Sequence, residues 1–137
     1  MSRILIAIED ASLFGLIQYK LSKSGYDVTG AFDGVQALNL LTSEKFDALL
    51  LDLMLPKTDG YQILRELQDG QANRPRVIMI VSTRGEEEDV LRAFEFGAVD
   101  YIAKPFSLNV LAARLEIALR FKSVQDEQQV QPSQVAG

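Results

Sequence analysis

With 137 residues, the chain has the length of one ordinary domain, and 47% hydrophobic with 24% charged residues is the composition of a folded protein rather than a disordered one. The formal net charge of -5 argues against a broad basic face, so we expect no nucleic-acid binding by this chain alone. Without cysteine there is no disulfide or thiolate metal site, and without histidine any chemistry must rest on carboxylates, hydroxyls and lysine.

Short apolar runs alternate along the chain with longer segments of helical period, a pattern typical of a parallel sheet covered by helices on both faces. The predicted strands are Ile4–Ile8, Asp27–Ala31, Ala48–Asp52, Val77–Ser82 and Tyr101–Ala103. The predicted helices are Ser12–Ser24, a helix following Asp33-Gly34, a short helix around Ile63–Leu67, Glu86–Phe96 and Leu108–Phe121. The sequence therefore predicts a doubly wound α/β domain of five parallel strands and five helices.

The apolar stripes indicate which side of each helix faces the core. The members of the first two stripes are Leu13, Leu16, Ile17 and Leu21, then Val35, Leu38 and Leu41. The strand Val77–Ser82 is apolar on both faces, which predicts an interior position. Residues 1–122 should form the domain, and residues 123–137, rich in Gln, Ser and Val, are predicted to be a disordered tail or the start of an interdomain linker.

No apolar run approaches the roughly 20 residues that a membrane-spanning helix needs. The amino terminus runs from an apolar segment directly into acidic residues and lacks a small-residue cleavage site, so it does not read as a secretory signal. We therefore expect a cytoplasmic protein with no membrane partner.

Residues with chemical capability follow four of the predicted strands. Glu9 and Asp10 come after the first strand, Asp52 ends the third, Ser82 ends the fourth and Lys104 follows the fifth. Ligands of open parallel sheets bind beyond the carboxyl ends of the strands, so these side chains should share one edge. Each also has an ordinary structural explanation, as a turn former, a helix cap or a solvated lysine at a strand end.

Carboxylates gathered at one edge repel one another unless a cation or protonation relieves them, and Mg²⁺ is the cation that suits oxygen ligands. A carboxylate beside a metal can act as a nucleophile toward phosphorus and form an aspartyl phosphate. Lys104 would neutralise charge on the phosphoryl oxygens, and Ser82 would donate a hydrogen bond to one of them. We further expect the Lys104-Pro105 peptide bond to be cis and to direct the lysine inward.

Over about residues 3–122 the chain resembles the receiver domains of bacterial two-component response regulators. The resemblance rests on four blocks in order: Glu9-Asp10, Leu50-Leu51-Asp52-Leu53-Met54-Leu55-Pro56 with Asp59-Gly60, Ser82-Thr83-Arg84-Gly85, and Gly97-Ala98-Val99-Asp100-Tyr101-Ile102-Ala103-Lys104-Pro105-Phe106. It implies a flavodoxin-like fold with strand order 2-1-3-4-5. It also implies a signalling switch rather than an enzyme, with slow self-dephosphorylation as its only turnover.

The resemblance assigns roles to individual residues. Asp52 would accept a phosphoryl group from a sensor histidine kinase or phosphotransfer protein. The residues that would hold Mg²⁺, or Mn²⁺ in its place, are Glu9, Asp10, Asp52 and Met54 through its backbone carbonyl. Ser82 and Lys104 would grip the phosphoryl oxygens, and Tyr101 would be the aromatic switch, although it also fits an ordinary amphipathic strand.

The resemblance also places the output on the face built from the helix Glu86–Phe96, the strand Tyr101–Ala103 and the helix Leu108–Phe121. Receivers attached to winged-helix domains usually dimerise there through three charge pairs. Here Asp100 and Arg114 fit one pair, Val90 and Val110 replace another, and Glu95 would meet Glu116. Like charges oppose association, so we expect no charge-paired dimer and an apolar surface for another downstream partner, with sequence drift as the alternative.

Two enzyme or carrier classes fit less well. An aspartyl-nucleophile phosphatase would carry a second acid two residues after Asp52, where this chain has Met54. A flavodoxin-like electron carrier would need a hydroxyl-rich phosphate loop where Glu9 and Asp10 stand. A receiver-like interaction module that takes no phosphate stays open, although no essential residue is missing.

Overall fold

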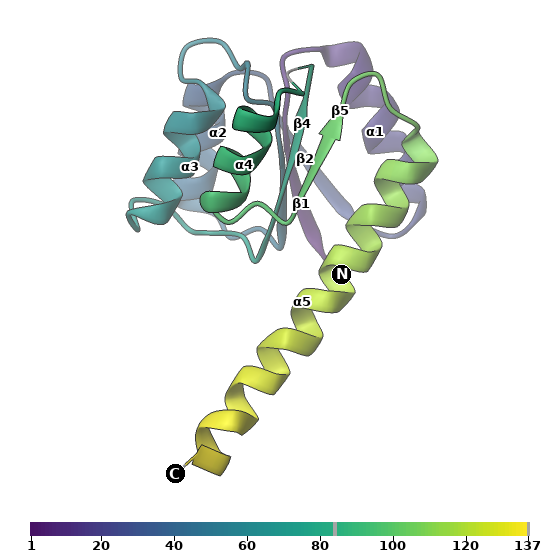
Figure 1. Cartoon of the computed structure of the whole chain (residues 1–137). Coiled ribbons are helices and arrows are strands. Elements are labelled where there is room, and N and C mark those ends of the chain that lie inside the picture. Colours follow the sequence, from purple (N-terminus) through teal and green to yellow (C-terminus); the bar gives the residue numbers. More distant parts are fainter. Residues whose placement is uncertain (84, 137) are drawn as a thin grey trace.

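A single five-stranded parallel sheet lies between two layers of helices (Figure 1). The computed structural model describes residues 1–83 and 85–136, with side chains described through residue 122. The strands are β1 (Arg3–Ala7), β2 (Asp27–Ala31), β3 (Ala48–Leu51), β4 (Val77–Ser82) and β5 (Asp100–Ala103). Their order is β2-β1-β3-β4-β5 with every pairing parallel, which confirms the predicted topology.

The helices follow their strands along the chain, and the first four keep their predicted positions to within a few residues, whereas α5 continues 15 residues past its predicted end at Phe121. Their bounds are α1 (Ala11–Lys23), α2 (Gly34–Ser43), α3 (Gly60–Gln68), α4 (Glu87–Glu95) and α5 (Leu108–Ala136). Helices α2, α3 and α4 cover one face of the sheet, and α1 and α5 cover the other (Figure 1). The predicted tail or linker over residues 123–137 lies outside the residues whose side chains are described and stays a prediction.

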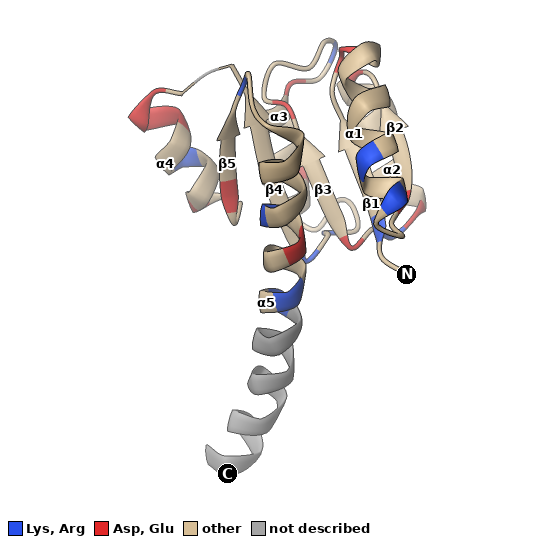
Figure 2. Ribbon diagram, turned by 90° about the vertical axis from the view of Figure 1, so that its right-hand side faces the viewer, with Lys and Arg blue, Asp and Glu red and all other residues tan. Residues whose placement is uncertain are grey.

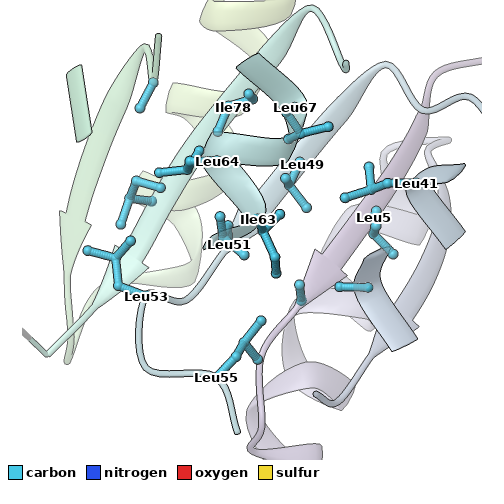
Figure 3. Close-up of a cluster of buried hydrophobic side chains, with 14 of the residues drawn as sticks. Leu5, Leu41, Leu49, Leu51, Leu53, Leu55, Ile63, Leu64, Leu67 and Ile78 are labelled. Carbon is cyan, nitrogen blue, oxygen red and sulfur yellow. The ribbon is translucent and has the colours of Figure 1, made fainter. Parts of the chain in front are cut away.

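Alternate residues of each strand feed two separate cores. In β1, Leu5 packs toward α2, α3 and α4, while Ile4 and Ile6 pack toward α1 and α5. The first core, drawn in Figure 3, gathers leucine and isoleucine side chains from the strands, from α2 and α3 and from the loop after β3. All six residues of β4 are buried, so the predicted interior strand is confirmed. Burying one such side chain contributes about 1.5–3 kcal/mol.

Two residues of the predicted apolar stripes face solvent instead. Leu16 in α1 is 56% exposed and Val35 in α2 is 45% exposed. Leu16 lies next to Ile17 in sequence, so it is rotated about 100° around the helix from that fully buried side chain. Val35 lies in the first turn of α2. The inward assignment of these two residues was therefore wrong.

Aspartates start the first three helices. Asp10, Asp33 and Asp59 precede α1, α2 and α3, and each carboxylate accepts a hydrogen bond from the backbone amide three residues later, at 3.0, 2.8 and 3.0 Å. Such caps satisfy amides that the helix leaves unpaired, at about 1 kcal/mol each. Because each helix follows a parallel strand, all three caps lie at the carboxyl edge of the sheet. This edge carries the predicted site.

Candidate functional site

Asp52 is the buried acidic residue at the centre of that edge. It directly follows β3 and is 6% exposed, and its backbone amide donates to the carbonyl of Ala7 at the end of β1 (3.0 Å). One carboxylate oxygen, Oδ1, accepts from the amide of Met54 (2.8 Å), and the other, Oδ2, accepts from Lys104 Nζ (2.5 Å). The carboxylate is therefore held by a backbone amide on one oxygen and by an ammonium on the other.

Lys104 reaches Asp52 because β5 lies beside β4. Its backbone amide donates to the carbonyl of Ser82 (2.8 Å), which continues the pairing of the two strands beyond their ends. The Lys104-Pro105 peptide bond is cis, as the sequence predicted. The Lys104 side chain is only 18% exposed, so its ammonium depends on Asp52 for compensation. The two residues lie 52 positions apart in the sequence, and the strand order brings them together as expected.

Ser82 and Tyr101 are the two other predicted site residues on β4 and β5. Ser82 ends β4 and is fully buried. Tyr101 in β5 is partly buried and packs against the core beneath α3 and α4. Ser82 therefore lies on the strand next to β3, and Tyr101 lies on the following strand, on the side of the sheet that α2, α3 and α4 cover.

Glu9 and Asp10 lie at the same edge, beyond β1, and both are exposed. Asp10 uses Oδ1 to cap α1 through the amide of Leu13 (3.0 Å), so the helix-cap explanation of this residue is confirmed. Within residues 1–83 and 85–122, the structure forms no group of three Asp or Glu side chains that could hold a metal ion. It thus pairs Asp52 with Lys104 but does not bring Glu9, Asp10 and Asp52 together as one cluster.

The loop between β3 and α3 folds tightly around the acid. Gly60, the first residue of α3, donates its amide to the carbonyl of Leu53 (3.1 Å). A Cβ at Gly60 would lie 2.7 Å from Leu53 Cα and 2.9 Å from the carbonyl oxygen of Asp52. Only a glycine allows this approach. The start of α3 is therefore seated directly on the peptide that follows Asp52.

The same loop is tied to α2 by contacts that the sequence pattern did not predict. The Gly34 amide donates to the carbonyl of Pro56 (3.0 Å), and Lys57, in the left-handed region at φ 70°, places its ammonium 3.4 Å from Asp33. The Gln36 amide, with help from the Lys57 ammonium, holds the pKa of Asp33 below its ordinary value. The Asp33-Gly34 pair was predicted only to precede a helix, because the contact with a distant loop has no signature in sequence.

An apolar groove of about 450 Å³ opens beside the Asp52–Lys104 pair, between α1 and the loop before α5. The residues that line it are Asp10, Ser12, Leu13, Leu16, Thr83, Lys104, Pro105 and Phe106. The exposed Leu16 described above is part of this lining, so its solvent-facing position leaves an apolar wall next to the site.

The face formed by α4, β5 and α5 carries the positions that form charge pairs in receivers attached to winged-helix domains. Arg114 lies 3.4 Å from Asp100 within the same chain, and Glu116 pairs with Arg120 one turn further along α5 (2.7 Å). Val110 is 45% exposed, whereas Val90 is partly buried. Figure 2 shows this side, with acidic residues gathered at the start of α4 and alternating charges along α5.

The sequence matches the family described as response regulator receiver domain over residues 4–116. This chain belongs to that family. It is thus a receiver domain of two-component response regulators, a class of phosphorylation-controlled switches that work with histidine kinases and effector domains and generally bind Mg²⁺. No helix within the described part of the chain is long and apolar enough to cross a membrane.

Receiver domains of known structure share this architecture. The Francisella response regulator 1452 receiver domain is 32% identical with a TM-score of 0.80, over 88% of this chain and 98% of that one. The BeF3-activated receiver domain of Klebsiella pneumoniae RstA is 35% identical with a TM-score of 0.76, over 86% and 98%. The alkaline phosphatase synthesis transcriptional regulatory protein PhoP of Bacillus subtilis is 40% identical over 118 residues, which cover 86% of this chain and 48% of that protein. The chain therefore spans about half the length of such curated relatives.

Proposed function

We propose that this receiver domain accepts a phosphoryl group on Asp52 from a sensor histidine kinase or phosphotransfer protein. The observation that carries the proposal is the Asp52 carboxylate, 6% exposed at the carboxyl edge and bound to Lys104 Nζ at 2.5 Å. This arrangement suits phosphoryl acceptance, because the Lys104 ammonium already lies where the phosphoryl group would add negative charge. With Met54 two residues after Asp52, the phosphatase alternative has no second acid at that position.

In the proposed reaction a carboxylate oxygen of Asp52 attacks the phosphorus of a phosphohistidine. The new oxygen–phosphorus bond forms as the phosphorus–nitrogen bond breaks, and the imidazole nitrogen leaves with the electron pair and takes up a proton. The Lys104 ammonium then neutralises part of the charge on the phosphoryl oxygens, and the Ser82 hydroxyl donates to one of them. Slow hydrolysis of the acyl phosphate is the only turnover that we expect.

The oxygen-rich edge suits a hard divalent cation, and we propose Mg²⁺, with Mn²⁺ as a substitute. The residues that would hold it are Asp10, Asp52, the backbone carbonyl of Met54 and Glu9. When bound, the cation supplies positive charge against the phosphoryl oxygens. Because the described residues form no group of three acids, uptake requires the carboxylates of Glu9 and Asp10 to come closer to Asp52.

We further propose that the charge change is reported through Tyr101 and the face formed by α4, β5 and α5, and that the domain is cytoplasmic. Phosphorylation adds about -1.5 to -2 charge, enough to shift a balance between two packings that differ by a few kcal/mol. The Asp100–Arg114 pair within one chain and the exposed Val110 favour a downstream partner other than a charge-paired second copy. The net charge of -5 speaks against nucleic acid as that partner.

Acetyl phosphate tests the acceptor. The domain with acetyl phosphate and Mg²⁺ should gain the mass of one phosphoryl group in intact mass spectrometry, and should gain none with EDTA. Asp52→Asn should gain none under either condition, with Asp59→Asn as the matched control, because Asp59 caps α3 and stays outside the site. An unmodified wild-type domain, or an adduct that persists in Asp52→Asn, would favour the inert interaction module.

Sedimentation velocity tests the surface. With a beryllofluoride adduct as the phosphoryl mimic, we expect no dimer that depends on Arg114. A dimer that forms only with the adduct and disappears in Arg114→Ala would show that the charge-paired mode is retained, against the proposal.

A further inference from the structure

Helices α3 and α4 are joined by a polar contact in an otherwise apolar layer. The hydroxyl of Tyr61, in α3, donates to Asp89 Oδ1, in the first turn of α4, at 2.8 Å. The guanidinium of Arg92, one turn further along α4, lies 4.1 Å from the centre of the Tyr61 ring. Figure 1 shows the two helices side by side on the same face of the sheet. One side chain of α3 is thus held by two residues of α4.

Tyr61 is also linked to Asp52 through the residue that precedes it in the chain. Tyr61 follows Gly60, which is seated on the carbonyl of Asp52 and on Leu53. The tyrosine is 6% exposed and belongs to the core cluster that includes Leu53. A continuous series of contacts therefore leads from the peptide of Asp52, through the start of α3, to the first turn of α4.

The contact is of a strong kind. A hydrogen bond to a carboxylate contributes more than one between neutral groups, and a cation above an aromatic face adds to it. Burial, and then the hydrogen bond to Asp89, raise the pKa of Tyr61 to about 12, so its hydroxyl stays a donor at every physiological pH. Tyr61 is also close enough to Tyr101, the expected switch residue, to be influenced by its charge.

We propose that Tyr61 is a positioning residue, a latch whose hydrogen bond to Asp89 and contact with Arg92 hold α4 against α3 and oppose a movement of α4 on phosphorylation. This inference rests on the proposed function, because it concerns the movement that the phosphoryl group drives. If the latch exists in only one of the two arrangements, linkage requires that its removal strengthens the binding of anything that favours the other.

Beryllofluoride, as a phosphoryl mimic with Mg²⁺, measures that linkage by isothermal titration calorimetry. Tyr61→Phe keeps the ring and deletes the donor, and it should bind beryllofluoride about tenfold more tightly than the wild type, the factor expected from one charge-assisted hydrogen bond. Its amides in α4 should also exchange about tenfold faster with solvent in the free domain. Asp89→Asn, which keeps an accepting oxygen but loses the charge, should bind beryllofluoride with an affinity between those of the wild type and Tyr61→Phe.

Tyr26→Phe is the matched control, since Tyr26 is a partly buried tyrosine on the opposite side, near Glu116 and Arg120. Its affinity for beryllofluoride should not change. If Tyr61→Phe loses stability but binds beryllofluoride with unchanged or weaker affinity, the contact is only structural and the latch is overturned. A wild-type domain that takes up no beryllofluoride would overturn the proposed function and the latch with it, so the two failures are distinguishable.

Discussion

Replacing Gly34 with alanine should displace the loop that follows Asp52. An ideal Cβ at this position would lie 1.7 Å from the carbonyl oxygen of Thr58, and two further atoms of Thr58 lie within 2.6 Å. Real Cβ contacts are not found below 3.0 Å, so the loop or the start of α2 must move by about 1.3 Å, the difference between the two distances. Such a shift also strains the hydrogen bond from Gly34 to Pro56 (3.0 Å).

The expected loss follows from these terms. Overpacking costs about 1–3 kcal/mol and the weakened hydrogen bond about 1 kcal/mol, while alanine returns at most about 1 kcal/mol as a better helix residue. We therefore expect Gly34→Ala to lower the free energy of unfolding by about 2 kcal/mol, and to slow phosphorylation because the loop carries the amide of Met54 that binds Asp52. Urea unfolding followed by circular dichroism measures the first effect.

Gly15 in α1 provides the matched control. It is exposed, and a Cβ there would meet nothing within 4 Å. Gly15→Ala should therefore raise the free energy of unfolding by about 0.5–1 kcal/mol. If the two variants have the same stability, the contact between α2 and the loop after β3 does not have the closeness described, and the reasoning is refuted.

Other perturbations have equally definite outcomes. Lys104→Met should lower the free energy of unfolding by about 3 kcal/mol, because it leaves the buried Asp52 carboxylate without its ammonium. In an Asp52→Asn background the same substitution should cost much less. Equal losses in the two backgrounds would show that the ion pair does not stabilise the fold. The raised pKa of Tyr61, about 12 against an ordinary 10.0, means that its stabilisation is complete below about pH 10 and is lost as the pH rises toward 12. Urea unfolding across this range should therefore show a loss of about 1–2 kcal/mol, reduced from the full shift by solvent screening, that Tyr61→Phe lacks, and parallel curves for the two proteins would contradict this. Leu50→Ala, at a fully buried centre of the sheet, should cost about 2–5 kcal/mol by chemical denaturation, and a loss below 1 kcal/mol would show a core that collapses around the gap.

The sequence pattern was sufficient for the two helical layers, because the alternation of buried residues follows directly from packing on both faces of a sheet, whereas the strand order was predicted from the resemblance to receiver domains. It was less reliable at the margins of the helices. Leu16 and Val35 belong to apolar patterns, yet the pattern does not tell how wide a strip of each helix the sheet covers. The width depends on how the helix is tilted and where it ends, which only the packed structure determines.

At the candidate site, too, some contacts were predicted from the sequence and others were not. The pairing of Asp52 with Lys104 followed from the rule that strand ends share an edge, and the structure confirms it. Asp10 was predicted to bind a metal, although an aspartate before a helix can also be a helix cap. The structure shows the cap. Sequence alone does not distinguish the two roles. The contacts of Gly34 and Tyr61 were missed because each joins segments that are distant along the chain.

The strand order leaves β2 and β5 at the borders of the sheet, and within residues 1–83 and 85–136 each pairs with another strand along one edge alone. Both strands are short and open with an aspartate, Asp27 facing Arg3 and Asp100 facing Arg114. A charged residue at the start of a border strand hinders the docking of a second sheet, because a matching strand would have to bury that charge. The domain therefore carries its own protection against edge-to-edge aggregation at both margins, independent of any signalling role.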